Sequence, residues 1–293
     1  MSRSPQFVWN PADYAANSAA QLAWARELIA KLHLRGNERV LDVGCGDGKV
    51  TAEIARALPR GEITGVDSSA EMIRFARTTF SQSENPNLKF QVMDARELHC
   101  ARPFDILFSN ATLHWVDDHP SFLRGAAACL KSGGRLVVSC GGKGNAQDVF
   151  AALRSVLRLK RWREHFRNLT APYFFHRPED YEKWLPRFGF EPRLVRLANK
   201  DATFPGPSGL AAWIRTTWLP YTQRVPPAQR EEFIAAVVER FIAEHPLDNA
   251  GKLTVRMVRL EINAVRIGAP VSDPARSEPQ RKRTGSEISA PRS

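Results

Sequence analysis

The chain has 293 residues, of which 43% are hydrophobic and 25% are charged, an ordinary globular composition. Its length suffices for one large domain or two smaller ones, and no apolar stretch reaches the roughly 18 residues that a membrane-spanning helix needs. The N-terminus lacks the apolar segment of a secretory signal, so we expect a soluble, cytoplasmic protein.

The formal net charge of the chain is +11. Lys and Arg attract phosphate groups where they cluster, but here they are spread along the whole sequence. The densest group, residues 281–283, lies in a segment rich in Pro, Ser and charge, 270–293, which we interpret as a disordered basic tail. We therefore do not expect a nucleic-acid partner.

The four cysteines are scattered, and no two of them form a C-x-x-C pair. This spacing indicates neither a zinc site nor a disulfide framework, and we expect no metal. The interpretation is that all four are small buried side chains: Cys45, Cys100, Cys129 and Cys140.

The first half of the chain alternates between patterns typical of helices and of buried strands. Residues 17–34 have apolar side chains at helical spacing, which predicts an amphipathic helix. Strands are then predicted at 39–44, 62–67, 88–94, 104–110 and 134–140, and helices at 49–58, 69–80 and 119–131. Such alternation predicts an α/β fold whose doubly wound, mostly parallel sheet binds ligands at the carboxyl ends of its strands.

The rhythm changes after residue 144. The patterns predict helices within 146–166, 173–190, 208–220 and 227–244, a strand at 191–204, and one or two strands at 252–267. We interpret this part as a helical cover, about 145–250, inserted late into the sheet. The prediction is one domain over residues 1–269, with its core at 36–142.

A cluster of glycines follows the first predicted strand. Gly44, Gly46 and Gly48 alternate after Asp42, which matches neither the G-x-G-x-x-G dinucleotide fingerprint nor the G-x-x-x-x-G-K-[ST] phosphate loop. A strand, a glycine turn and a helix N-terminus bring the backbone close to a ligand. Because the Asp42 carboxylate would repel a pyrophosphate, the pattern favours a cationic or zwitterionic ligand.

The stretch VLDVGCGDG, residues 40–48, resembles the first motif of class I S-adenosylmethionine-dependent methyltransferases, an acid followed by G-x-G-x-G. The order of the later motifs is also similar, because acids end the second and third predicted strands and FDILFSNATLHWV and LKSGGRLVV match the fourth- and fifth-strand motifs. The resemblance covers about residues 38–140. It implies a Rossmann-like fold with a seven-stranded sheet.

The resemblance also implies which residues bind S-adenosylmethionine. Asp67 would bond the ribose hydroxyls, Asp94 would contact adenine, and Asn110 would contact the methionyl end of the cofactor. Residues 110–113 do not form the N-P-P-[YF] motif of enzymes that methylate adenine or glutamine. The implied cofactor residues are Asp42, Gly44, Cys45, Gly46, Gly48, Asp67, Ser68, Met72, Asp94, Ala95 and Asn110.

Three outer segments, WNPADY, NATLHWVDDH and WIRTTWLPY, are similar to the trans-aconitate methyltransferase branch. This implies methylation of a carboxylate on a small molecule, which needs positioning and no dedicated base, because the acceptor is already ionised. His114 and Trp115 would act beside the methyl group, while Tyr14, Trp115 and Arg215 would bind the acceptor. The alternatives are methylation of nitrogen or hydroxyl on another metabolite, and a basic RNA-associated methyltransferase.

Overall fold

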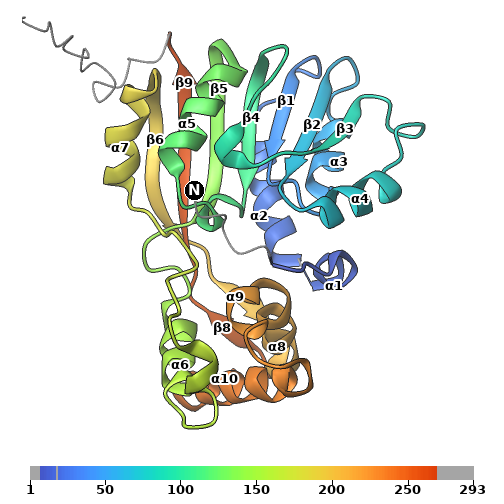
Figure 1. The fold of residues 1–293 in the computed structure, drawn as a ribbon. Helices are drawn as coiled ribbons and strands as arrows, with labels where there is room; N and C mark the ends of the chain where they lie inside the picture. The colour runs from blue at the N-terminus through green and yellow to red at the C-terminus, as the bar shows by residue number, and fades with distance from the viewer. Residues whose placement is uncertain (1–6, 18, 269–293) are drawn as a thin grey trace, which may run out of the picture.

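A seven-stranded sheet forms the centre of the protein (Figure 1). The computed structural model describes residues 7–17 and 19–268, so the predicted tail at 270–293 lies outside the described residues. In spatial order the strands are β3 (Leu88–Val92), β2 (Glu62–Asp67), β1 (Arg39–Val43), β4 (Phe104–Asn110), β5 (Leu130–Gly141), β9 (Val258–Arg266) and β6 (Phe190–Asn199). The first five strands in the chain pair in parallel, and β9 is antiparallel to both of its neighbours. The predicted mostly parallel seven-stranded sheet is therefore confirmed.

Helices cover both faces of this sheet. Helices α2 (Ala19–Ala30), α3 (Lys49–Arg56) and α4 (Ala70–Thr79) share one buried core with the sheet, which includes Ile54 and Ile73. On the other face, α5 (His119–Cys129) and α7 (Pro178–Arg187) contribute Phe122 and Leu185 to a second core. The strands read as continuous apolar runs because both of their faces are buried.

The cover lies beyond the carboxyl ends of the parallel strands, below the sheet in Figure 1. It comprises α6 (Gln147–Leu157), η3 (Arg163–Phe166), α8 (Gly206–Thr217), α9 (Leu219–Thr222), η4 (Pro227–Gln229) and α10 (Arg230–Glu244), with an antiparallel pair of strands, β7 (Ala202–Phe204) and β8 (Leu253–Val255). These elements bury a core of their own, which includes Trp162 and Phe233.

Some boundaries differ from the prediction. Residues 178–199, predicted as part of the cover, form α7 and β6, and Tyr181 and Phe190 pack in the core of the sheet. The cover is therefore built from two separate segments. The strand predicted at 191–204 is divided between β6 and β7, which belong to different sheets. The N-terminal helical region comprises α1 (Pro11–Asn17) and α2.

The cysteine prediction is wrong for two residues. Cys100 and Cys129, which ends α5, are joined by a disulfide with a Cα–Cα distance of 5.4 Å. Twenty-nine positions separate them, and no local pattern indicates that the loop before β4 returns to the end of α5. Cys45 and Cys140 are free and buried, as predicted.

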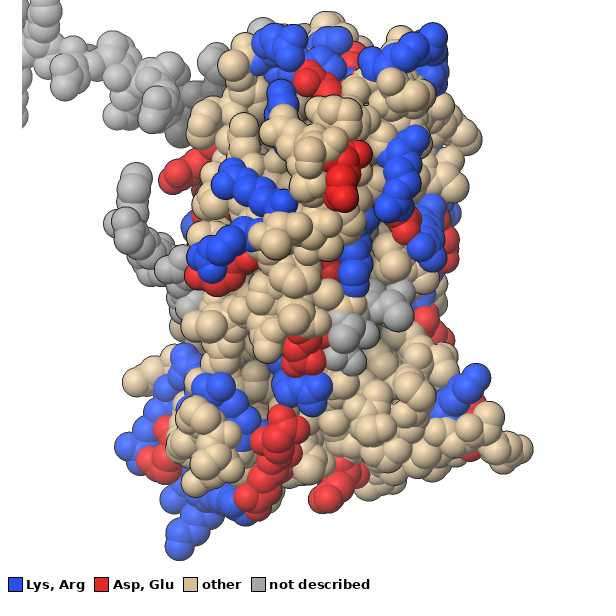
Figure 2. All heavy atoms as spheres, turned by 90° about the vertical axis from the view of Figure 1, so that its right-hand side faces the viewer, with Lys and Arg blue, Asp and Glu red and all other residues tan. Residues whose placement is uncertain are grey.

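Surface charge bears on the partners that the chain can accept. On the side that faces the viewer in Figure 2, Lys and Arg are interspersed with Asp and Glu and do not form one continuous basic patch. Within residues 7–17 and 19–268, no helix has both the length and the apolar character needed to cross a bilayer.

Candidate active site

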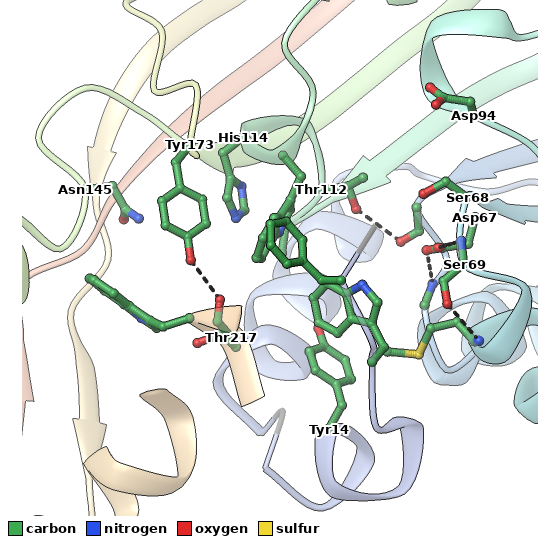
Figure 3. Close-up of a pocket in the computed structure, with 18 of the residues that line it drawn as sticks. Tyr14, Asp67, Ser68, Ser69, Asp94, Thr112, His114, Asn145, Tyr173 and Thr217 are labelled. Atoms are coloured by element: carbon green, nitrogen blue, oxygen red, sulfur yellow. Dashed lines mark hydrogen bonds between the residues drawn. The ribbon is translucent and has the colours of Figure 1, made fainter. Parts of the chain in front are cut away.

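A cavity of about 890 Å³ lies between the carboxyl ends of the parallel strands and the cover (Figure 3). We call one part of its lining the glycine-turn end: Gly44, Gly46, Asp67, Ser68, Ser69, Glu71, Met72, Asp94, Arg96 and Glu97. We call the other part the aromatic end: Phe7, Trp9, Trp115, Phe150, Tyr173, Phe175, Trp213 and Trp218, with His114, Asn145 and Thr217 among them. Arg259 also lines the cavity, and we count it with this end because its charge lowers the pKa of His114. Tyr14 and Thr112 lie between the two ends in Figure 3.

The three glycines of the turn between β1 and α3 have different roles. All three have a left-handed backbone, with φ of +77° at Gly44, +53° at Gly46 and +84° at Gly48, which favours glycine. A Cβ on Gly44 would overlap Thr112, and one on Gly48 would lie 2.7 Å from the Phe90 ring. A Cβ on Gly46 would meet no atom within 4 Å, because Gly46 borders the cavity. Two glycines therefore permit packing, whereas Gly46 leaves open space for a ligand.

Asp67, the last residue of β2, holds the glycine turn from the neighbouring strand. Its Oδ2 accepts the Gly46 N–H at 3.0 Å and its Oδ1 accepts the Ser69 N–H at 2.9 Å. Ser69 Oγ in turn accepts the Met72 N–H at the start of α4. Burial raises the pKa of Asp67, and a cation bound in the cavity would favour its ionised form.

Asp42 lies beneath the turn and does not line the cavity. Its side chain is buried, and its Oδ2 accepts the Thr51 hydroxyl at 2.7 Å. Burial raises the pKa of Asp42 to about 7, the Thr51 hydrogen bond lowers it and the nearby Asp67 raises it. Cys45 and Gly48 of the turn also lie outside the cavity lining. Asp42 therefore supports the turn from below.

Asp94 follows β3 and lines the cavity, but its carboxylate already forms an ion pair with Arg96. Arg96 Nε and Nη2 lie 3.0 and 2.6 Å from the two Asp94 oxygens, and Arg96 Nη1 lies 3.0 Å from Asp117. Burial would raise the pKa of Asp94, but the hydrogen bonds and charge of Arg96 outweigh it and leave that pKa below its usual value. An adenine amino group would join these donors. Ala95 is buried directly beside Asp94 and is absent from the lining.

His114 and Trp115 lie in a short 3₁₀ turn, η2 (Leu113–Trp115), and α5 begins four residues after Trp115. His114 Nδ1 accepts the Gly141 N–H at 3.2 Å, so Nε2 carries the proton of the neutral ring. Burial, with smaller effects of Arg259 and His119, lowers the pKa of His114 to about 3. His114 is therefore a neutral donor at the cavity wall.

Aromatic rings surround this turn. The Trp115 ring centroid lies 4.9 Å from that of Tyr173 and 5.3 Å from that of Trp9, and Tyr14 packs edge-on against Trp9. Burial raises the pKa of Tyr14, and the charges of Asp47 and Asp67 raise it further. Tyr14 and Trp115, both predicted to bind the acceptor, therefore line the cavity.

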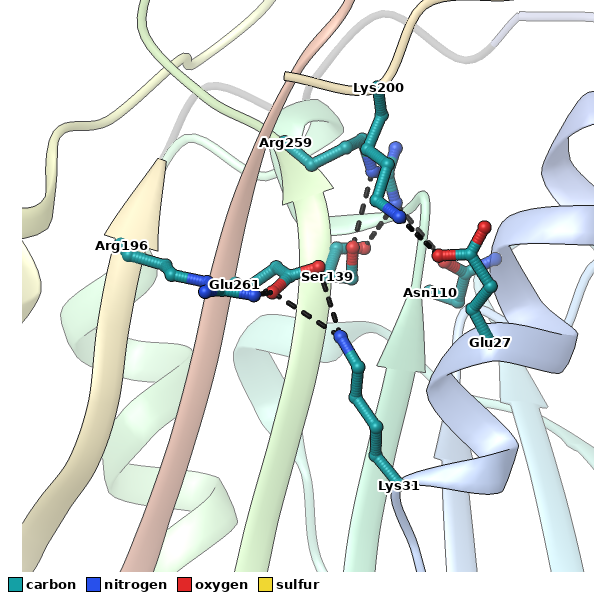
Figure 4. Close-up of polar contacts among 8 residues, drawn as sticks. All are labelled: Glu27, Lys31, Asn110, Ser139, Arg196, Lys200, Arg259 and Glu261. Atoms are coloured by element: carbon teal, nitrogen blue, oxygen red, sulfur yellow. Dashed lines mark hydrogen bonds and ion pairs between the residues drawn. The ribbon is translucent and has the colours of Figure 1, made fainter. Parts of the chain in front are cut away.

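Arg215, the third residue predicted to bind the acceptor, is placed elsewhere. Its guanidinium forms an ion pair with Asp13 at 3.0 Å, and it is absent from the cavity lining. The cation that the cavity does contain at its aromatic end is Arg259 at the start of β9, which the sequence reasoning missed (Figure 4). Arg259 is buried in a strand that lies between two other strands, but the same strand also contains Glu261, Asn263 and Arg266, so the sequence pattern does not single it out.

Arg259 reaches over the end of β5 toward β4. Its Nε donates to Ser139 Oγ at 3.2 Å, and its Nη2 donates to the Ser139 carbonyl oxygen at 2.6 Å and to Asn110 Oδ1 at 3.1 Å. Its guanidinium also lies 5.0 Å from the centre of the Trp24 ring. Asn110 does not itself line the cavity; it orients the arginine that does.

Comparison with known proteins places this geometry in a family. A family model described as "Methyltransferase domain" matches residues 34–183, just over half of the chain. Trans-aconitate 2-methyltransferase of Deinococcus radiodurans is 30% identical over 250 residues, which cover 82% of this chain and 92% of that protein. The enzyme of the same name from Escherichia coli O7:K1 is 27% identical over 261 residues, covering 88% and 98%.

The fold has a counterpart among solved structures. Phosphoethanolamine N-methyltransferase 2 of Haemonchus contortus, solved with phosphomonomethylethanolamine and S-adenosylhomocysteine, has a TM-score of 0.57 at 15% identity. The match covers 88% of this chain and 57% of that one, and at this identity it supports the fold alone. With the family match and the relative at 30% identity, these findings establish that the chain is an enzyme of the methyltransferase-domain family of S-adenosylmethionine-dependent methyltransferases.

Proposed function

We propose that this enzyme methylates a carboxylate of a small-molecule acid and so forms a methyl ester. The observation that carries the proposal is the state of His114. Its Nδ1 is occupied by the Gly141 N–H and its Nε2 carries the proton, so neither nitrogen can remove a proton from an acceptor. An acceptor that arrives ionised needs no base.

The other groups at the aromatic end support the same reading. No carboxylate of the described residues lines this end, since the acids of the lining are Asp67, Glu71, Asp94 and Glu97. The Tyr173 hydroxyl donates to the Thr217 carbonyl oxygen at 3.0 Å, and burial raises its pKa well above the ordinary value. An amine held as ammonium, or a hydroxyl, would find no base among the described residues of this end to deprotonate it.

The glycine-turn end suits the cofactor. The open space beside Gly46 is the kind of cradle that a close-lying ligand fills, and Asp67 stands beside it at the end of β2. This end contains four carboxylates, whereas its arginine, Arg96, is already paired with Asp94. The excess of negative charge favours a positively charged ligand. Asp67, Ser68 and Met72 are the lining residues that we assign to S-adenosylmethionine, and the acid at Asp94 is the assigned adenine contact.

When bound, S-adenosylmethionine supplies a methyl group on a positively charged sulfur, so that a carbon–sulfur bond breaks as a carbon–oxygen bond forms. The protein contributes position and shelter. His114 Nε2 and Arg259 can donate hydrogen bonds to one carboxylate oxygen while the other faces the methyl carbon. Reacting atoms held about 3–3.5 Å apart in a water-poor site gain most from such alignment.

The experiment is a panel of carboxylic acids incubated with the enzyme and methyl-labelled S-adenosylmethionine, followed by mild alkaline hydrolysis of the product. We expect labelled product that releases methanol in base. A base-stable methylated product would refute ester formation and would favour methylation of nitrogen or of a hydroxyl. Labelling of RNA in place of any acid would favour the basic RNA-associated alternative.

A further inference from the structure

Aromatic side chains dominate one half of the cavity. Eight rings line the aromatic end, and neighbouring rings contact one another. The ring centroids of Phe150 and Trp218 lie 4.5 Å apart, and those of the stacked Tyr173 and Phe175 lie 5.6 Å apart. Rings of this kind bury large apolar area and bind apolar bodies. The wall is shaped for a ligand that is itself largely apolar.

Several polar atoms of this wall are already hydrogen-bonded within the protein. Tyr173 donates its hydroxyl to the Thr217 carbonyl oxygen, and the Thr217 hydroxyl donates to the Trp213 carbonyl oxygen at 2.6 Å. Asn145 Oδ1 accepts the Val258 N–H at 3.0 Å. An acceptor with several polar groups would have to compete for these atoms or leave its own groups unpaired, which is costly in a buried site.

Among the residues that the structure describes, one guanidinium supplies the positive charge of the aromatic end. Arg259 is 4% exposed, and no carboxylate of the described residues forms an ion pair with it. Glu261, the nearest acid on its strand, is paired with Lys31 and Arg196 (Figure 4). Burial lowers the pKa of Arg259 to about 10, which leaves it charged at neutral pH. The charge of Glu261 favours the charged form of Arg259 from a distance. A buried cation that no carboxylate of the described residues pairs directly favours binding of a ligand anion.

We propose that the acceptor is a monocarboxylic acid with an apolar body, whose carboxylate binds Arg259 and whose body packs against the rings of the aromatic end. This rests on the proposed methyl-ester function and narrows its substrate class. The other arginine of the lining, Arg96, is already paired with Asp94 and Asp117. A tricarboxylate such as trans-aconitate would therefore bury two charges that no further Lys or Arg of the described lining could meet.

The direct test compares acids on the unmodified enzyme with labelled S-adenosylmethionine. The probes are trans-cinnamate for a ring, decanoate for a chain and trans-aconitate for a tricarboxylate. We expect kcat/KM for the better apolar acid to exceed that for trans-aconitate by at least about tenfold, the scale on which apolar contacts discriminate substrates. Equal or better turnover of trans-aconitate would overturn the proposal while leaving ester formation intact. A base-stable product from any acid would instead overturn the ester function.

Two variants test the parts of the site. Phe150→Leu removes a ring from the wall, and we expect a rise of about three- to tenfold in KM for the apolar acid. Phe80→Leu is the matched control, because Phe80 is also a partly buried ring but packs against the α4 side of the sheet, outside the cavity. Equal effects of the two substitutions would overturn the assignment of the wall.

Arg259→Gln tests the carboxylate site, because a carboxylate can come from the acceptor or from the methionyl part of the cofactor. We expect KM for the acid to rise at least about tenfold, while the Kd for S-adenosylhomocysteine stays within about twofold. If S-adenosylhomocysteine binding falls and 5′-methylthioadenosine binding does not, Arg259 holds the cofactor's carboxylate and the proposed anchor is wrong. Should the glutamine variant not fold, Arg259→Lys, which keeps the charge but not the forked donors, is read in the same way.

Discussion

Substitution of Gly46 by alanine would separate a glycine that shapes the chain from one that makes room for a ligand. Gly46 has φ of +53° and a Cβ there would meet no protein atom within 4 Å. The left-handed backbone costs an L-residue roughly 1–2 kcal/mol. We therefore expect Gly46→Ala to lower the free energy of unfolding by about that amount and to leave the fold intact. In the cavity, however, the new methyl group would occupy cofactor space.

A matched control is available in the same chain. Gly133 has φ of +77°, and a Cβ there would also meet no atom within 4 Å, but Gly133 is exposed and distant from the cavity lining. Gly133→Ala should therefore cost similar stability without affecting ligands. Chemical denaturation gives the stability of both variants, and isothermal titration gives their affinity for S-adenosylhomocysteine. We expect Gly46→Ala alone to weaken binding, by at least about tenfold or 1.4 kcal/mol. Equal affinity in the two variants would refute the assignment of Gly46.

Three further predictions concern charge. Asp67→Asn should weaken S-adenosylhomocysteine binding, measured by titration calorimetry, by on the order of 1.5–3 kcal/mol, the range for hydrogen bonds to charged groups; unchanged affinity would remove Asp67 from the cofactor site. At saturating substrates, kcat should change by less than about twofold between about pH 6 and pH 9, because the acceptor is ionised and the pKa of His114 is about 3; a rise of about tenfold per pH unit would indicate a base. Burial raises the pKa of Asp42 from 3.8 to about 7. As pH rises between these two values, ionisation of Asp42 therefore lowers the free energy of unfolding, by up to about 4 kcal/mol in total. Asp42→Asn should therefore stabilise the cofactor-free protein in urea denaturation more at pH 8 than at pH 5, and a pH-independent effect would contradict the shift.

Local patterns predicted most of the sheet and the glycine turn. An apolar run, a turn that needs left-handed glycines and an amphipathic helix are each readable within about ten residues, and β1, Gly44 and α3 lie where those patterns placed them. The later helices were predicted in the same way, from apolar side chains at helical spacing. What failed is the assignment of a segment to a layer, because α7 has an ordinary amphipathic pattern that does not say whether the sheet or the cover buries it.

The acceptor side of the cavity could not be read locally. Arg259 bonds Asn110 across 149 positions, and Arg215 reaches Asp13 across 202. A strand or helix arginine looks the same in the sequence whether its partner is a surface acid or a ligand. The aromatic residues are ambiguous in the same way. Tyr173 lines the cavity and Phe233 is buried in the core of the cover, but in the sequence both are simply aromatic residues expected to be buried. Only the fold decides which of them border open space.

The two ends of the cavity differ in charge, and this difference orders the two ligands of the proposed reaction. Carboxylates at Asp67 and Glu71 attract a positively charged donor and repel an acid, whereas Arg259 does the opposite at the aromatic end. Because the interior screens charge less than water does, each ligand is favoured at one end and disfavoured at the other. The two reactive groups then meet where the two ends join, with His114 on the aromatic side. A neutral histidine suits that position, because an added positive charge there would oppose the approach of the methyl-bearing sulfonium while a proton acceptor is not needed.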